Sequence, residues 1–326
     1  MTNGYGYIDP PQMKWNAAPP PGPEMRMNQL IRQHVQGEPF DVGLLGVPLS
    51  RSSISPSAAS ENPNAIRMIW KSFAAYNIDY DIDLSTLQIV DLGDVKMHVT
   101  DIPRCHHNIE QGLLEVLDRN PPFLPVMIGG DHSITNPLVK AVKQHHRDKT
   151  IGIVQFDTHF DLRDLRDGGP SNGTPIRGLI ESQTVSGQHV VNIGLHGYFN
   201  TYSLKQYADQ HGVRYVTLRE VKRKGIEQVV AEAVEYLRQR VDLIYVTVDI
   251  DVLDAAFAPA APASTPGGMS PWELFDALYL LGKEPLVCGM DLVCLDPFRD
   301  HRHMGTVKTG AHAILNLLCG YMARQR

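Results

Sequence analysis

Three apolar runs in this chain each end in carboxylate or imidazole side chains, and this arrangement limits the possible folds more than any other feature. The runs cover residues 123–128, 153–156 and 243–248. The polar tails that follow them are Gly129-Gly-Asp-His132-Ser133, Asp157-Thr-His159-Phe-Asp161 and Asp249-Ile-Asp251-Val-Leu-Asp254. Short runs rich in β-branched residues predict buried strands. If these strands are parallel, the tails meet at one edge of the sheet, where ligands bind in open α/β folds.

The residue types in the tails are those that bind divalent metal ions. Alternate side chains of an extended segment share a face, so the three polar side chains of the second tail can point to one side. An acidic turn with solvated side chains would show the same residues, but the recurrence at two other strand ends favours a metal centre. A set dominated by carboxylates suits a hard or borderline ion such as Mn²⁺, and bridging carboxylates suit a pair of ions. The candidate ligands are His132, Asp157, His159, Asp161, Asp249 and Asp251.

Strand-like runs alternate with segments of helical periodicity along the chain. This predicts an α/β protein with a central, mostly parallel sheet and helices on both faces. We expect helices over 27–36, 109–118, 133–144, 228–240, 270–281 and 310–321, and further strands over 40–47, 87–90, 190–194, 213–218 and 287–295. No repeat or linker divides residues 27–326, which we interpret as one catalytic domain. Residues 1–26 are rich in Pro and Gly and predict an irregular arm that lies against a neighbouring subunit.

Composition excludes several classes of function. The net charge is −6 and there is no long basic run, which argues against nucleic acid as a partner. No apolar run approaches the roughly 18–20 residues that span a bilayer, and the N-terminus lacks a basic stretch followed by an apolar one. The four cysteines show no CxxC spacing, which is typical of reduced thiols. We therefore expect a soluble, cytoplasmic enzyme that acts on a small molecule.

The three polar tails resemble the signatures of the ureohydrolase (arginase–agmatinase) superfamily, and the resemblance extends from about Gly46 to the C-terminus. It implies an arginase-like fold and a hydrolase that cleaves C–N bonds in guanidino or amidine groups. It also implies two Mn²⁺ ions per subunit, with other divalent transition metals as alternatives, and a homo-oligomer, either a trimer or a hexamer.

The resemblance also assigns roles to the candidate ligands. One manganese would be held by His132 and Asp161 and the other by His159 and Asp251. The carboxylates of Asp157 and Asp249 would bridge the two ions. Asp161 would in addition be catalytic, carrying a proton towards the leaving nitrogen.

The loop over residues 167–177 is similar to that of formimidoylglutamases, whereas arginases and agmatinases usually have His where Asn172 stands. This likeness implies hydrolysis of N-formimidoyl-L-glutamate to glutamate and formamide, with Asn172 hydrogen-bonded to the substrate. Arg163 or Arg177 would bind a substrate carboxylate, because a guanidinium pairs with it bidentately. Either arginine would otherwise only brace the loop.

Two positions depart from the family pattern. Cys294 stands where the family has a Glu that contacts the cationic substrate group, and His196 stands where formimidoylglutamases tend to have Arg. We place both among the candidate substrate contacts. These departures are compatible with an unchanged substrate or with a relative that acts on an altered, less cationic one. A guanidino hydrolase of the agmatinase, guanidinobutyrase or arginase type remains an alternative, as does a non-catalytic binding protein on the same fold.

Overall fold

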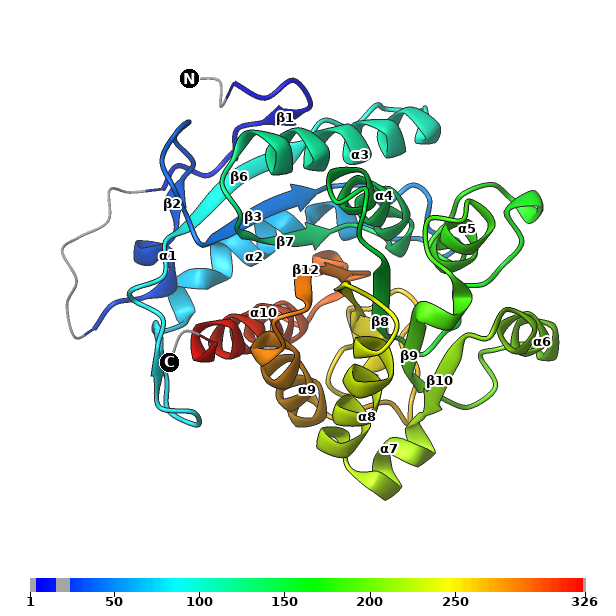
Figure 1. Cartoon of the computed structure of the whole chain (residues 1–326). Helices are drawn as coiled ribbons and strands as arrows, with labels where there is room; N and C mark the ends of the chain where they lie inside the picture. Colours follow the sequence, from blue (N-terminus) through cyan, green and yellow to red (C-terminus); the bar gives the residue numbers. More distant parts are fainter. Residues whose placement is uncertain (1–3, 16–23, 325–326) are drawn as a thin grey trace.

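A single large sheet runs through the centre of the molecule (Figure 1). The computed structural model describes residues 4–15 and 24–324. Within these residues the sheet has ten strands in the order β1-β6-β3-β7-β12-β11-β8-β9-β10, and β2 also pairs with β6. The pairings are parallel except for β1 with β6, which is antiparallel. The strands are β1 Ile8–Asp9, β2 Arg32–Gln33, β3 Val42–Val47, β6 Ile89–Val95, β7 Leu124–Gly129, β8 Ile151–Phe156, β9 Val190–Leu195, β10 Arg214–Thr217, β11 Leu243–Asp249 and β12 Val287–Val293; β4 Tyr76–Asn77 and β5 Ile82–Asp83 form a separate small hairpin.

Helices cover both faces of the sheet (Figure 1). One apolar core packs beneath α2, α7, α8, α9 and α10, and the other beneath α3, α4, α5 and α6. The helices are α1 Met27–Leu30, α2 Asn62–Ile69, α3 Ile102–Arg119, α4 Thr135–His145, α5 Pro175–Glu181, α6 Tyr202–His211, α7 Leu218–Lys224, α8 Ile226–Arg238, α9 Pro271–Lys283 and α10 Gly305–Ala323. The predicted α/β class, with a mostly parallel sheet between two helical layers, is confirmed.

Strand alternation supplies the two cores. In β8, Val154 and Phe156 belong to one core while Ile151 and Ile153 belong to the other. Successive side chains of a strand point to opposite faces, so a strand covered on both sides must be apolar throughout. This requirement explains why the central runs contain few polar residues before their C-terminal ends.

The expected helix from residue 270 begins as the sequence indicates. The Ser270 hydroxyl accepts a hydrogen bond from the Glu273 N–H, and the Glu273 carboxylate accepts one from the Ser270 N–H. Pro271 occupies the first turn, where its missing N–H costs nothing. The capping box therefore fixes the start of α9.

Strand β6 differs from the expectation. Its predicted end at Val90 was too early, because the strand continues to Val95 and contains Asp91 and Asp94. Both carboxylates pair with the buried Arg67 guanidinium of α2, at 2.8 Å each. This cation comes from a distant part of the chain and allows two carboxylates to lie within a buried strand.

Three further boundaries differ. Helix α3 begins at Ile102, so His106 lies within it rather than before it. The expected helix over 27–36 ends at Leu30, and the chain continues into β2. The arm over residues 1–26 is not wholly irregular, because β1 pairs with β6 of the same chain. Residues 1–3 and 16–23 of this arm lie outside the described residues.

Gly130 follows β7 and contacts the ends of two other strands. A Cβ atom at this position would lie 1.7 Å from the carbonyl oxygen of Leu49, so only glycine fits. The Gly130 N–H donates to Val47 O, and its carbonyl accepts from the Cys294 N–H at 2.8 Å. The ends of β3, β7 and β12 are thereby tied together. Among the described residues, no helix is long and apolar enough to cross a lipid bilayer.

Candidate metal centre

The six predicted ligands converge at the C-terminal edge of the sheet. They lie at or just after the C-terminal ends of β7, β8 and β11, and β12 lies between β7 and β11. The side chains are buried apart from His159, which is 27% exposed. The sheet order explains the convergence, because the C-terminal ends of parallel neighbours meet at one edge.

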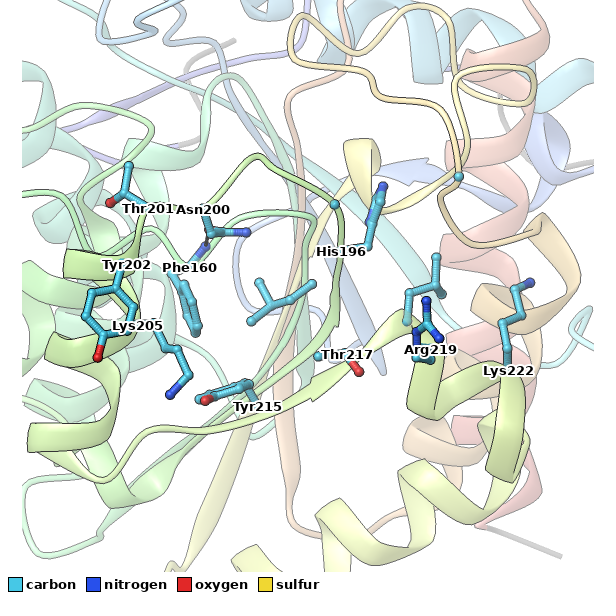
Figure 2. A pocket seen from close by; sticks show the side chains of 14 residues that line it. Phe160, His196, Asn200, Thr201, Tyr202, Lys205, Tyr215, Thr217, Arg219 and Lys222 are labelled. Atoms are coloured by element: carbon cyan, nitrogen blue, oxygen red, sulfur yellow. Dashed lines mark hydrogen bonds between the residues drawn. The ribbon is translucent and has the colours of Figure 1, made fainter.

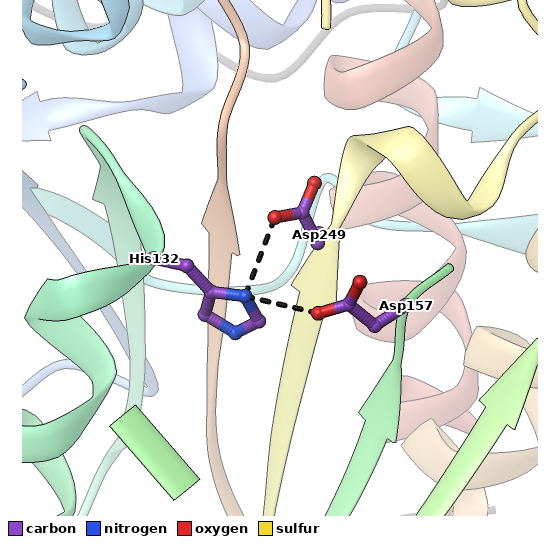
Figure 3. A group of neighbouring side chains, drawn as sticks. All are labelled: His132, Asp157 and Asp249. Atoms are coloured by element: carbon purple, nitrogen blue, oxygen red, sulfur yellow. Dashed lines mark ion pairs between the residues drawn. The ribbon is translucent and has the colours of Figure 1, made fainter. Parts of the chain in front are cut away.

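One group of ligands surrounds His132 (Figure 3). Its Nδ1 atom lies 2.7 Å from Asp161 Oδ2, 3.1 Å from Asp157 Oδ2 and 3.3 Å from Asp249 Oδ2. Asp161 reaches this position from a left-handed backbone conformation, with φ +55°. Such backbone strain in a non-glycine residue is typical of functional sites.

A second group surrounds His159. Its Nδ1 atom lies 3.1 Å from Asp251 Oδ2 and 3.4 Å from Asp157 Oδ1. Asp157 therefore presents one carboxylate oxygen to each group, the geometry expected of a bridging ligand. Asp249 contributes Oδ2 to the first group, while its Oδ1 accepts the Asp251 N–H at 2.9 Å.

Behind His132 a chain of hydrogen bonds determines which ring nitrogen carries the proton. Thr247 Oγ1 lies 2.9 Å from His132 Nε2 and 2.5 Å from Asp291 Oδ1. A carboxylate can only accept, so the Thr247 hydroxyl donates to Asp291 and accepts from His132 Nε2–H. Thr135 and Tyr245 donate to Asp291 Oδ2 at 2.8 and 2.9 Å and hold the carboxylate in place. His132 Nδ1 is left with a lone pair that points into the site.

The hydrogen bonds around His132 leave acceptor atoms in the site, and these atoms fit a cation. His132 Nδ1 and Asp161 Oδ2 are both buried, and neither has a hydrogen-bond partner of acceptable geometry among the described residues. Two acceptors that face one another at 2.7 Å repel unless a positive charge lies between or beside them. Imidazole and carboxylate donors suit Mn²⁺ and its neighbours in the first transition series.

Proton affinities show the same excess of negative charge. Burial raises the pKa of Asp161 to about 7, with the Asp157 charge adding to the rise. Burial, followed by Asp251 and Asp157, raises the pKa of Asp249 to about 7. Burial alone would lower the pKa of His159, but the Asp251 and Asp157 carboxylates outweigh it and raise the value to about 12. The cluster gains stability by taking up positive charge, either as protons or as metal ions.

A cavity of about 120 Å³ opens onto these ligands. Its lining includes His159, Asp161, Asp249 and Asp251, together with side chains from four loops. The loop residues include Ile54, Ser55, Phe160, Arg163, Asn172, Gly173, Phe199, Asn200 and Ala263. The carboxylates in the lining are all predicted metal ligands, so no separate acid is present to pair with a cationic substrate tail.

Two of the predicted substrate contacts line this cavity. Asn172 Oδ1 accepts the Ile54 N–H at 2.9 Å, which joins the loop around residue 54 to the loop over 167–177. Arg163 is an exposed side chain whose guanidinium has neither an ion pair nor a hydrogen bond within the described residues. An arginine without a partner beside a metal site is available to bind an anionic group.

Arg177 has a different environment. Its guanidinium donates to Asp164 Oδ2 at 2.8 Å and to Glu181 Oε1 at 2.6 Å, and it lies over the Tyr207 ring. It is absent from the cavity lining. Of the two uses left open by the sequence, these contacts support bracing of the loop.

Cys294 lies beside the ligands but outside the cavity lining. The residue is 6% exposed and has φ +60°. Burial raises the pKa of the thiol well above its usual value, and the nearby Asp249 and Asp251 add to the rise. The side chain is therefore a neutral group beside a predicted bridging ligand.

His196 is placed away from the metal cavity. It lines a neighbouring cavity of about 920 Å³, together with Lys205, Tyr215, Arg219 and Lys222 (Figure 2). Phe160 and Asn200 line both cavities and form the wall between them. The His196 ring contacts Gly194 O and Thr265 Oγ1, at 3.1 Å each.

Sequence reasoning missed the polar residues behind the ligands and the apolar wall of the cavity. Asp291 carried a usable signal, because a carboxylate inside the apolar run over 287–293 must have buried partners. Phe199 gave no comparable signal, since exposed aromatic residues in loops are common.

Comparisons with known proteins agree with this geometry. Residues 40–320 match the family model described as the arginase family. A formimidoylglutamase from Halalkalibacterium halodurans is 46% identical over 278 residues, which cover 85% of this chain and 86% of that protein. The crystal structure of formimidoylglutamase from Bacillus subtilis superposes with a TM-score of 0.88 at 35% identity, covering 95% of this chain and 96% of the other.

Another solved structure contains metal. It is a variant of Trypanosoma cruzi formiminoglutamase with Mn²⁺, with a TM-score of 0.84 at 25% identity, covering 93% of this chain and all of the other. An agmatinase from Pyrococcus horikoshii is more distant, at 30% identity over 78% of this chain and 83% of that protein. The fold and site define a metal-dependent hydrolase of C–N bonds. The chain belongs to the arginase family.

Proposed function

We propose that this protein is a formimidoylglutamase with two Mn²⁺ ions per chain, which hydrolyses N-formimidoyl-L-glutamate to glutamate and formamide. The observation that carries the proposal is the convergence of six imidazole and carboxylate ligands beside an unpaired arginine. The likeness to formimidoylglutamases, which is closer than that to the agmatinase, supports the same substrate.

The ligand set divides into two positions. His132 and Asp161 would hold one ion and His159 and Asp251 the other, and Asp157 and Asp249 would be shared. Asp157 supports this division directly, because its two oxygens face different histidines. Bound metal ions lower the pKa of water and so supply the nucleophile near neutral pH.

Proton movement falls to Asp161. Its carboxylate lines the cavity while its Oδ2 faces His132 Nδ1. A carboxyl group at the floor of the cavity can accept a proton from the attacking water and deliver it to the leaving nitrogen. Asn172 has no ionisable proton, so it orients the loop and the substrate without acting as a relay.

Substrate recognition relies on charge of the opposite sign to that in an agmatine-type site. Arg163 pairs with a carboxylate of the glutamate moiety, because its planar guanidinium can donate two parallel hydrogen bonds to the two carboxylate oxygens. The amidine end lies towards the metal ligands. Because Cys294 is a neutral thiol, it adds no negative charge to that of these ligands, as a glutamate at this position would. A cationic tail would instead meet Arg163 and be repelled.

The test is an activity panel on manganese-loaded protein with N-formimidoyl-L-glutamate, agmatine, arginine and 4-guanidinobutyrate, in which the formamide or urea released is measured. Hydrolysis of N-formimidoyl-L-glutamate with kcat/KM at least about 100-fold above the other substrates is expected, a ratio that corresponds to about 2.7 kcal/mol. Preference for a guanidino substrate would overturn the assignment. The expected trimer or hexamer and the cytoplasmic location stay predictions.

A further inference from the structure

We propose that His196 is a positioning residue that holds Phe199 and the loop over residues 254–268 together as one wall of the metal cavity. The inference rests on the proposed function for its effect on the substrate. His196, Phe199 and Thr265 are not among the predicted metal ligands.

The His196 ring is fixed at both nitrogens. Nδ1 lies 3.1 Å from the Gly194 carbonyl, which can only accept, so Nδ1 carries the proton. In the neutral ring Nε2 is therefore an acceptor, and the Thr265 hydroxyl, also at 3.1 Å, donates to it. Thr265 is 5% exposed, so this hydrogen bond has little competition from water. The ring thereby connects the end of β9 to the loop over 254–268.

Phe199 packs against this fixed ring. Its centroid lies 5.7 Å from that of His196 and 6.4 Å from that of His159, with interplanar angles of 71° and 74°. Both are edge-to-face arrangements, which are favourable for aromatic pairs. Phe199 therefore stands between the positioning histidine and a metal ligand, and it lines the metal cavity.

Gly197 allows the chain to fold the phenyl ring back in this way. Its φ is +61°, and a Cβ atom there would lie 2.9 Å from Phe199 Cε2. Only a residue without a side chain accommodates both the left-handed turn and the ring above it. The turn at Gly197 thus allows the Phe199 ring to take its position beside His196.

The loop over 254–268 has anchors in its backbone. Asp254 accepts a hydrogen bond from Gly267 N at 2.6 Å, and the Ala260 carbonyl accepts from the Asp296 N–H at 2.9 Å. The Thr265 hydroxyl on His196 is a side-chain anchor, two residues from Ala263 in the cavity lining. Loss of the side-chain anchor leaves the backbone anchors intact and loosens the part of the loop around Ala263.

Phe199 and Ala263 give this part of the cavity an apolar surface. Such a surface suits the methylene groups between the amidine and the carboxylates of the proposed substrate. Displacement of the wall weakens substrate binding in the ground state and the transition state alike, so KM should rise while kcat remains. His196 touches no metal ligand by hydrogen bond among the described residues, so metal content should not change.

The experiment compares Thr265→Val, which is nearly isosteric but lacks the hydroxyl, with Thr265→Ser, which keeps it. His196→Ala and His196→Gln form a second pair, because the Gln amide can restore a contact to Thr265. Thr265→Val and His196→Ala should each raise KM by about tenfold, with kcat within about twofold and full manganese content. Thr265→Ser and His196→Gln should recover part of the loss.

Amide hydrogen exchange supplies a readout that needs no substrate. Thr265→Val and His196→Ala should accelerate exchange in residues 197–201 and 263–265, while the strands at the metal centre keep their protection. Unchanged exchange and unchanged KM in both variants would overturn the role of His196. An inactive wild-type protein would contradict the proposed function, and the exchange data would still decide whether His196 anchors this wall.

Discussion

His132 Nε2 and Thr247 Oγ1 lie 2.9 Å apart, and this contact sets the protonation of a metal-site histidine from behind. Because Thr247 must donate to Asp291, the hydroxyl accepts from His132 and leaves Nδ1 free to bind metal. Hydrogen bonds of this kind orient a ligand and raise its basicity.

Removal of the Thr247 hydroxyl should therefore weaken metal binding. We expect Thr247→Val to lose about 10- to 100-fold in manganese affinity, because His132 Nε2–H is left without a buried acceptor. Thr247→Ser keeps the hydroxyl and serves as the control. Competitive titration with a metal-binding dye measures both, and equal affinities would contradict the role of this hydrogen bond.

Arg163 should control the choice of substrate tail. Arg163→Met should raise KM for N-formimidoyl-L-glutamate by a factor that corresponds to about 2–3 kcal/mol, the worth of a charged hydrogen-bonding pair. Relative activity on agmatine should increase, since the repelling charge is gone. Arg163→Lys should be intermediate, because an ammonium cannot form the bidentate pair. An unchanged substrate ratio in Arg163→Met would assign recognition of the carboxylate elsewhere.

Replacing Cys294 by the glutamate usual in the family tests whether the cysteine changes activity on guanidino or formimidoyl substrates. A glutamate there would lie close to Asp249 and Asp251, so it needs a cation as partner. We expect Cys294→Glu to increase turnover of guanidino or formimidoyl substrates and to destabilise the protein without substrate by roughly 1–3 kcal/mol. Cys294→Ser is the control for loss of the thiol. Unaltered kinetics in Cys294→Glu would leave the cysteine without a functional explanation.

His106 should make the fold sensitive to acid. Burial, assisted by the Lys140 charge, lowers the pKa of His106 to about 4, and its Nε2 lies 3.0 Å from Ser133 Oγ. The unfolded chain takes up this proton near pH 6.5 and the folded chain only near pH 4. The stability that His106 provides is thus complete above pH 6.5 and is lost as the pH falls towards 4.

The loss amounts to about 3 kcal/mol for a shift of this size. His106→Gln, which keeps a hydrogen-bonding group but cannot ionise, should lose less stability than wild type between pH 7 and 4.5. Urea unfolding of the metal-free proteins at the two pH values measures the difference. Equal losses in the two proteins would show that His106 is not the group responsible.

The clustering of the six candidate ligands was predictable because each lies within five residues of a strand end that local periodicity marks. His132 and Asp157 needed only the rule that parallel strands bring their C-terminal ends together. The capping box at Ser270 was equally local. For such features, the chemistry and the secondary structure are encoded in the same short segment.

Features that depend on distant partners were not predictable in this way. The expected strand over 87–90 stopped short of Asp91 and Asp94, because their partner Arg67 lies elsewhere in the sequence and only folding brings the three together. His196 follows a strand in the same manner as the candidate metal ligands, yet its ring turns towards Gly194 and Thr265. Side-chain direction beyond a strand end depends on the tertiary partner, which local sequence does not reveal.

The bridging role of Asp157 is the most direct test of the binuclear centre. Metal content and turnover of N-formimidoyl-L-glutamate should be measured together for wild type and Asp157→Ala after manganese loading and gel filtration. The structure predicts two ions per chain and activity in wild type, and loss of both ions and of turnover in a variant whose circular dichroism shows it to be folded. An Asp157→Ala protein that retains two ions and full activity would contradict the account.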